Sequence, residues 1–336
     1  MLLQSRRTLP RLQCYASKLA VGPRVYSRNL ATADATGNHE AGIADPEAYC
    51  RDLVRKRDYE SYLIGSFYPR RLQGAFFALR AFYVELASVQ DNVSNSMIGK
   101  MRMQFWRDAI KNIADGRPPR HPIALALHDA SQRANLLSYH LRRIIDARDA
   151  ELHTPTHLTL ESLTAHAEST SSTFFYLLLS LLNLSSSSTF SHAASHLGIA
   201  QSIHVLLRAL PYHASKGRMV IPAEITARHG VRQEDVFRRG GNADGISDAV
   251  FEFATVANDN LLTAREMFKQ SSNGGDGGKV PQVAMPIFLY GVRRSQRLLH
   301  ARLCVAFGTR GRARVPFFTL CAGGPKRKLT DKVVVA

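Results

Sequence analysis

The chain has 336 residues, of which 45% are hydrophobic, and it carries a formal net charge of +17. This length can bury a sizeable core, and the composition is ordinary for a globular protein. The longest apolar run, residues 174–184, is too short for a membrane-spanning helix, so we expect a protein that is soluble or peripheral to a membrane.

The positive charge is concentrated at the two ends of the chain. Residues 1–33 hold six basic residues and no acidic one, and residues 291–336 hold eleven basic residues against one acidic residue. The body between them, residues 34–290, has 27 basic and 26 acidic residues and is nearly neutral. Because nucleic-acid binding needs a basic face on the folded body, this distribution predicts no nucleic-acid partner.

Residues 1–34 have the composition of a mitochondrial transit peptide. They are rich in Arg, Ser, Ala and Leu, contain no acid before Asp34, and lack the apolar stretch of a secretory signal. Arg24 lies shortly before a candidate cleavage point, so we expect the mature chain to begin between Ser27 and Ala35. The alternative for this segment is a basic tail without structure.

From about residue 45 to residue 300 the apolar residues recur at helical spacing. Breakers are confined to short stretches, at residues 67–69, 116–119, 154–156 and 273–281. Few segments alternate as strands do, so the pattern predicts an all-α domain of about eight to ten helices. Pro46 and Pro122 are suited to first helical turns. Residues 301–336 form a basic tail whose structure the pattern does not indicate.

Three stretches of this domain resemble the squalene/phytoene synthase family. Residues 66–71 read S-F-Y-P-R-R, residues 81–91 read A-F-Y-V-E-L-A-S-V-Q-D, and residues 208–222 read R-A-L-P-Y-H-A-S-K-G-R-M-V-I-P. The resemblance covers about residues 46–290. It implies the helical fold of class I isoprenyl (terpenoid) synthases, whose enzymes join prenyl diphosphates with the help of magnesium.

Most of the carboxylates that hold magnesium in this family are missing here. Aligned on the flanking residues, the first motif, D-D-x-x-D, falls on Ala87–Asp91 and the second, D-x-x-x-D, begins directly after Arg208. Of the first motif only Asp91 remains, with Ala87 and Ser88 in place of the other aspartates and Glu85 just upstream. In the second motif, which follows Arg208, Ala209 and His213 stand in place of both aspartates. Since magnesium needs several oxygen ligands, we expect no metal site, no catalytic residue and no cofactor.

Other groups in the domain are further candidates for binding sites. Arg208, Lys216 and Arg218 are suited to an anion or a lipid head group. His192 and His196 have the spacing of a zinc pair without a third ligand, and the four cysteines of the chain show no C-x-x-C spacing. The acids at 146, 149 and 151 lie among arginines and favour a salt-bridged, solvent-facing surface over a metal site.

The region that lines the prenyl tunnel in the family falls on residues 170–175, which read T-S-S-T-F-F. A Phe stands there in place of a Gly, which indicates a narrowed or filled tunnel.

The sequences at 102–107, 192–198, 211–213 and 229–235 resemble a mitochondrial branch of the family. Its members are non-enzymatic and act in the assembly of respiratory complex I on the matrix side of the inner membrane. The resemblance implies a pseudoenzyme that binds complex I subunits or other assembly factors, together with the inner-membrane surface. The alternatives are an active head-to-head prenyl transferase and a binder of lipid or prenyl chains.

Overall fold

A computed structural model of the chain describes residues 45–93, 95–271 and 279–291. All of them belong to the second of two units into which the chain divides, Ile43–Ala336. The predicted transit peptide (1–34) and basic tail (301–336) lie outside the described residues.

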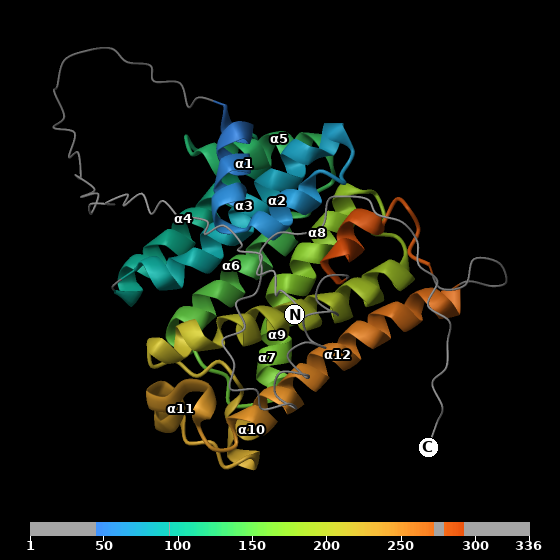
Figure 1. Ribbon diagram of the computed structural model, residues 1–336. Helices are drawn as coiled ribbons and strands as arrows, with labels where there is room; N and C mark the ends of the chain where they lie inside the picture. Colours follow the sequence, from blue (N-terminus) through green and yellow to red (C-terminus); the bar gives the residue numbers. More distant parts are fainter. Residues whose placement is uncertain (1–44, 94, 272–278, 292–336) are drawn as a thin grey trace, which may run out of the picture. The chain divides into compact units, whose positions relative to one another are not determined.

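The described residues form helices joined by short loops, without a strand, which confirms the predicted all-α class (Figure 1). The helices outnumber the prediction because several are too short to show a period. They are α1 Pro46–Arg57, α2 Tyr59–Gly65, α3 Arg70–Asn92, α4 Ser96–Ala114, α5 Pro122–Arg133, α6 Ser138–His153, α7 Leu160–Ala167, a π-helix η1 Glu168–Ser172, α8 Thr173–Leu181, α9 Ser188–Ser215, α10 Ala223–Arg228, α11 Gln233–Arg239, a 3₁₀ turn η2 Gly240–Asn242, α12 Ile246–Ser271, and a last helical segment at 285–291.

Side-chain caps fix the start of several helices. The Asp45 carboxylate accepts hydrogen bonds from the backbone N–H groups of Glu47 (3.1 Å) and Ala48 (3.2 Å), and Pro46 occupies the first turn, as predicted. Such caps satisfy N–H groups that have no partner inside the helix.

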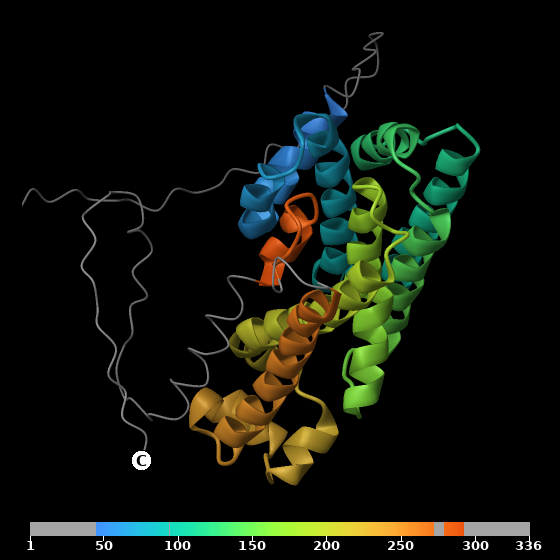
Figure 2. The same cartoon turned by 90° about the vertical axis from the view of Figure 1, so that its right-hand side faces the viewer.

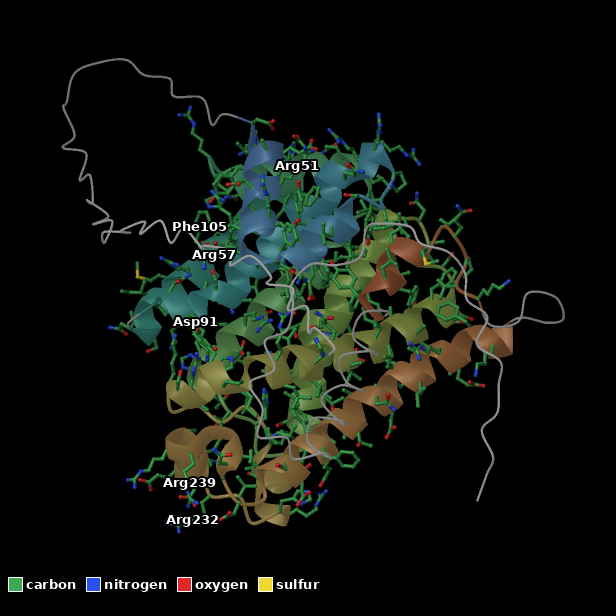
Figure 3. The ribbon with its side chains drawn as sticks, in the orientation of Figure 1. Arg51, Arg57, Asp91, Phe105, Arg232 and Arg239 are labelled. Atoms are coloured by element: carbon green, nitrogen blue, oxygen red, sulfur yellow. The ribbon has the colours of Figure 1, made fainter. Side chains whose placement is uncertain are left out.

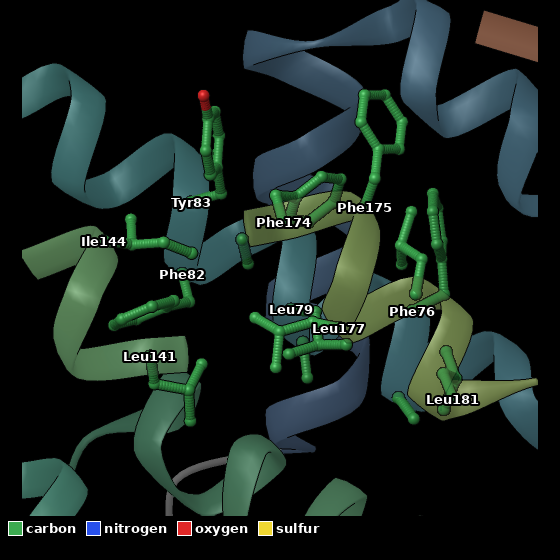
Figure 4. Close-up of a cluster of buried hydrophobic side chains, with 14 of the residues drawn as sticks. Phe76, Leu79, Phe82, Tyr83, Leu141, Ile144, Phe174, Phe175, Leu177 and Leu181 are labelled. Carbon is green, nitrogen blue, oxygen red and sulfur yellow. The ribbon is translucent and has the colours of Figure 1, made fainter. Parts of the chain in front are cut away.

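Two hydrophobic clusters form the core. The first lies among α1, α3, α4, α5, α6 and α8 and includes Trp106. Figure 4 shows Phe76 and Phe82 of this cluster. The second lies among α7 and α9 to α12 and includes Ile203 and Phe253. The long helix α9 contributes side chains to both clusters, and α12 runs beside it in both views (Figures 1 and 2). Within the described ranges, no helix is long and apolar enough to cross a bilayer.

Helix α9 also packs very closely against the π-helix η1. A Cβ atom on Gly198 would lie 2.3 Å from the Ser172 Oγ and 2.5 Å from the Ser172 Cα, so only glycine allows this approach. The Ser172 hydroxyl donates to the Ser195 carbonyl oxygen across the same contact (2.9 Å). The two elements therefore hold each other in a fixed register.

Candidate functional site

The two degenerate motifs lie on α3 and α9. Asp91 is at the end of α3, where its side chain is 39% exposed (Figure 3). One of its oxygens accepts a hydrogen bond of 2.7 Å from Arg218, in the segment that follows α9, and Lys216 Nζ lies 4.0 Å from the same oxygen. The surviving aspartate is thus engaged by cations from the second motif region.

The other residues of the motifs do not join Asp91. Glu85 lines a groove on the α4 side of α3, and the Ser88 hydroxyl donates to the Glu85 carbonyl oxygen (2.9 Å). Arg208 lies 3.5 Å from Glu60 of α2. Of the three cations predicted to bind an anion, Arg208 is thus beside Glu60, whereas Lys216 and Arg218 are beside Asp91. On α9, burial and the charge of Arg218 lower the pKa of His213.

This donor set does not fit the magnesium that the fold family uses. The first motif, on α3, supplies Asp91, one oxygen of which already accepts a hydrogen bond from Arg218. The second motif, on α9, supplies only the methyl group of Ala209 and the imidazole of His213. Magnesium requires near-octahedral oxygen coordination, which these groups cannot provide. The described residues also contain no cluster of three or more His, Cys, Asp or Glu side chains able to hold a metal ion.

A buried polar network joins the same helices about two turns deeper, where Tyr83 lies on α3 and Ser202 on α9. The Tyr83 hydroxyl lies 2.9 Å from the Ser171 hydroxyl of η1, and the Ser202 hydroxyl donates to that of Ser171 (2.7 Å). From α6, Arg148 donates to the Tyr83 oxygen (3.2 Å) and to Glu151 (2.7 Å). Side chains therefore connect the two motif regions at two levels, through Asp91 and Arg218 and, about two turns deeper, through Tyr83, Ser171 and Ser202.

The pKa values of Glu151 and His166, two side chains of this region, are both lower than their ordinary values. Burial raises the pKa of Glu151, but the Arg148 and His166 side chains outweigh it and hold that pKa below its ordinary value. Burial, together with the charge of Arg148, lowers the pKa of His166 to about 4. At neutral pH the network thus contains a charged Arg148–Glu151 pair beside a neutral His166.

Sequence reasoning missed this network. The sequence pattern favoured a solvent-facing surface for the charges of α6, whereas Arg148 and Glu151 are largely buried. The ion pairing predicted for the acids of α6 is confirmed, since Asp146 and Asp149 pair with Arg107 of α4, at 2.8 Å and 2.7 Å. The sequence shows the i,i+3 spacing of Arg148 and Glu151. It does not show which face of α6 is buried, because that depends on the helices that pack against α6.

Aromatic side chains fill the region that forms the tunnel in the family. Phe174 and Phe175 of α8 are both buried, Phe174 against Tyr83 (ring centroids 5.0 Å apart) and Phe175 against Tyr290 (5.3 Å; Figure 4). The guanidinium of Arg80 lies 5.0 Å from the Phe174 ring centroid and pairs with Asp58. This packing agrees with the narrowing expected at residues 170–175.

Two cavities lie outside this region. One, of about 600 Å³, is lined by residues of α6, α8, α9 and their loops, including His140, Tyr176 and Ser191. The other, of about 410 Å³, is the groove beside α4. His192 is exposed and His196 lies 2.9 Å from an oxygen of Asn260, so the two histidines do not share a ligand.

The sequence is similar to one family of proteins and to several named relatives. A family model described as squalene/phytoene synthase matches residues 54–309. The Rattus norvegicus protein named NADH dehydrogenase (ubiquinone) complex I, assembly factor 6, is 40% identical over 267 residues, covering 80% of this chain and 76% of that protein. Its Homo sapiens namesake is 38% identical over 289 residues, covering 84% of this chain and 83% of that protein.

A solved structure also shares the helical arrangement. The squalene synthase HpnC from Alicyclobacillus acidocaldarius matches with a TM-score of 0.67 at 17% sequence identity, over 78% of this chain and 94% of that one. At this identity the likeness concerns the fold, and it confirms the class I isoprenyl-synthase-like arrangement expected from the motifs.

Proposed function

This chain belongs to the squalene/phytoene synthase family, and from that premise we propose that it is a non-catalytic member that serves the assembly of mitochondrial respiratory complex I. Relatives that are 38–40% identical over most of the chain carry the name of a complex I assembly factor. The observation that carries the non-catalytic part is the pairing of Asp91 with Arg218, opposite Ala209 and His213.

The active transferase is the less favoured function on chemical grounds. Ionisation of an allylic diphosphate needs magnesium ions held by carboxylates on both walls. Here Arg218 and Lys216 act as partners of Asp91, and Phe174 and Phe175 are buried in the segment where the sequence predicts a narrowed or filled tunnel. The domain therefore works by its surface, through binding of complex I subunits or other assembly factors.

The proposal places the protein in the mitochondrion, on the matrix side of the inner membrane, as a peripheral protein. It keeps the predicted division into a transit peptide at 1–34, a helical domain at 45–300 and a basic tail at 301–336. N-terminal sequencing of the organellar protein tests the first boundary, and an intact Met1 there would contradict it.

The non-catalytic part predicts that the purified chain releases no pyrophosphate from farnesyl diphosphate with magnesium or manganese. The reason is that one engaged carboxylate leaves the ions under-coordinated. The measurement compares the natural chain, the Asp91→Ala variant and a blank without protein, and all three should agree. Release above the blank that Asp91→Ala abolishes would establish the transferase instead.

A further inference from the structure

The outer face of α4 carries four exposed large apolar side chains within three helical turns. Met97 and Met101 are 60% and 67% exposed, and Ile98 and Phe105 are 45% and 41% exposed. We call these four residues, with Lys100 and Arg102, the α4 face. Exposed apolar side chains scattered singly need no explanation, but a contiguous group marks a surface that binds something.

Helix geometry arranges this face as an apolar row between two cations. Met97, Met101 and Phe105 are spaced by four residues and lie in one row, with Ile98 beside it. Lys100 falls on one side of the row and Arg102 on the other, and both are exposed. The opposite side of the helix is buried through Met103, Trp106 and Ile110, so the apolar row is additional to the side that packs in the core.

The α4 face is basic without a balancing acid of its own. Residues 96–107 contain no Asp or Glu, and no ion pair among the described residues involves Lys100 or Arg102. The nearest acid along α4 is the exposed Asp108, on the same side of the helix and one turn beyond Gln104, from which it accepts a hydrogen bond of 3.0 Å. Arg107, the third cation of this stretch, points to α6 and is neutralised by Asp146 and Asp149. Glu85 lines the adjacent groove together with Arg102, Phe105 and His121.

This charge pattern selects the kind of partner. A second copy packed antiparallel on the same row and centred on Met101 would set Lys100 of one copy beside Arg102 of the other, which like-charge repulsion disfavours. A phospholipid surface with anionic head groups suits it, because the apolar row can enter the boundary of the acyl chains while Lys and Arg extend to the phosphates. Methionine, with its flexible thioether, adapts to such an irregular surface.

We propose that the α4 face is the surface by which this chain lies on an anionic phospholipid membrane. The inference rests on the proposed function, since it gives the peripheral location a definite contact surface. It assigns the apolar contact to Met97, Ile98, Met101 and Phe105 and the electrostatic contact to Lys100 and Arg102.

Flotation of the full-length protein with lipid vesicles tests this assignment. One set of vesicles is phosphatidylcholine alone, and the other has equal parts of phosphatidylcholine and phosphatidylserine. The natural chain should bind the second set. M97Q/M101Q replaces two apolar side chains of the contact and should weaken binding to the anionic vesicles by about tenfold or more. K100Q/R102Q removes two positive charges and should weaken the same binding by about fivefold for each charge.

Two controls separate the α4 face from general effects. The basic ends of the chain also attract anionic lipid, but this attraction is screened at raised salt, where the loss caused by M97Q/M101Q should persist. The double variant L158Q/L262Q removes exposed apolar side chains elsewhere, which are 72% and 50% exposed, and it should bind as the natural chain does. Unchanged melting temperatures confirm that the variants are folded.

Several results would overturn the assignment. Vesicle binding by M97Q/M101Q equal to that of the natural chain would do so, as would failure of the natural chain to bind anionic vesicles. A dimer in sedimentation velocity that M97Q/M101Q dissolves would assign the face to a second copy. Because the vesicles contain no complex I, these results leave the proposed assembly function standing, and that function is measured separately in cells.

Discussion

At the scale of single residues, the contacts of Asp91 are the observation on which the proposed loss of catalysis rests. In the enzymes of the family, the corresponding carboxylates hold metal ions; here the side chain lies 2.7 Å from Arg218 and 4.0 Å from Lys216. The pair is partly exposed, so its contribution to stability is small, on the order of 1 kcal/mol or less. We therefore expect Asp91→Ala to leave the stability of the fold nearly unchanged.

His166 makes the stability of the domain depend on pH. Its pKa falls from the ordinary 6.5 to about 4 in the folded protein. As the pH falls from 6.5 towards 4, the unfolded chain therefore binds a proton there that the folded chain does not, and the free energy of unfolding decreases. Over the whole window, we expect a loss of about 3 kcal/mol from this residue.

Thermal melts of the natural chain and of His166→Gln between pH 7 and pH 4 check this expectation. The variant cannot titrate at this position, so its melting temperature should fall less steeply with pH. His192→Gln, at an exposed position on α9, serves as the control and should follow the natural chain. Parallel curves for His166→Gln and the natural chain would show that the buried histidine is not the cause.

At the scale of helices, the close contact of α9 with η1 depends on one glycine. A Cβ at position 198 would meet the Ser172 backbone as well as its hydroxyl, and backbone cannot move aside cheaply. We expect Gly198→Ala to destabilise the domain by about 1–3 kcal/mol. Gly241→Ala is the matched control, because nothing lies within 4 Å of its added Cβ.

Chemical denaturation of the two glycine variants measures the difference. A midpoint for Gly198→Ala equal to that of the natural chain would mean that α9 and η1 can separate at little cost. A loss confined to Gly198→Ala would support the fixed register that holds the Ser171–Ser202 hydrogen bond in place.

The long helices and the motif positions on α3 and α9 could be predicted because their periods and spacings are local. The short helices α10 and α11 could not, since fewer than two turns give no reliable period. The burial of Arg148 and Glu151 was missed for a different reason. An i,i+3 charge pair has the same spacing on a solvated face and on a covered one, and what covers α6 comes from segments distant in sequence.

At the scale of the whole molecule, the domain combines the fold of an isoprenyl synthase with side-chain contacts that join its two motif regions. The contacts that hold it together are the core clusters, in which Trp106 packs against Phe82 and His121. If function depends on fold and surface, a change in the core should matter more than a change in the former metal site. Trp106→Ala should cost about 3–5 kcal/mol, enough to unfold a marginally stable domain.

The most direct test measures assembled complex I on native gels from cells in which Asp91→Ala replaces the natural chain. We expect the normal level of complex I with Asp91→Ala, and a reduced level both in cells without the chain and in cells with Trp106→Ala. A collapse of complex I with Asp91→Ala, while the variant stays folded and abundant, would contradict the account, because it would show that the last motif carboxylate still performs an essential task.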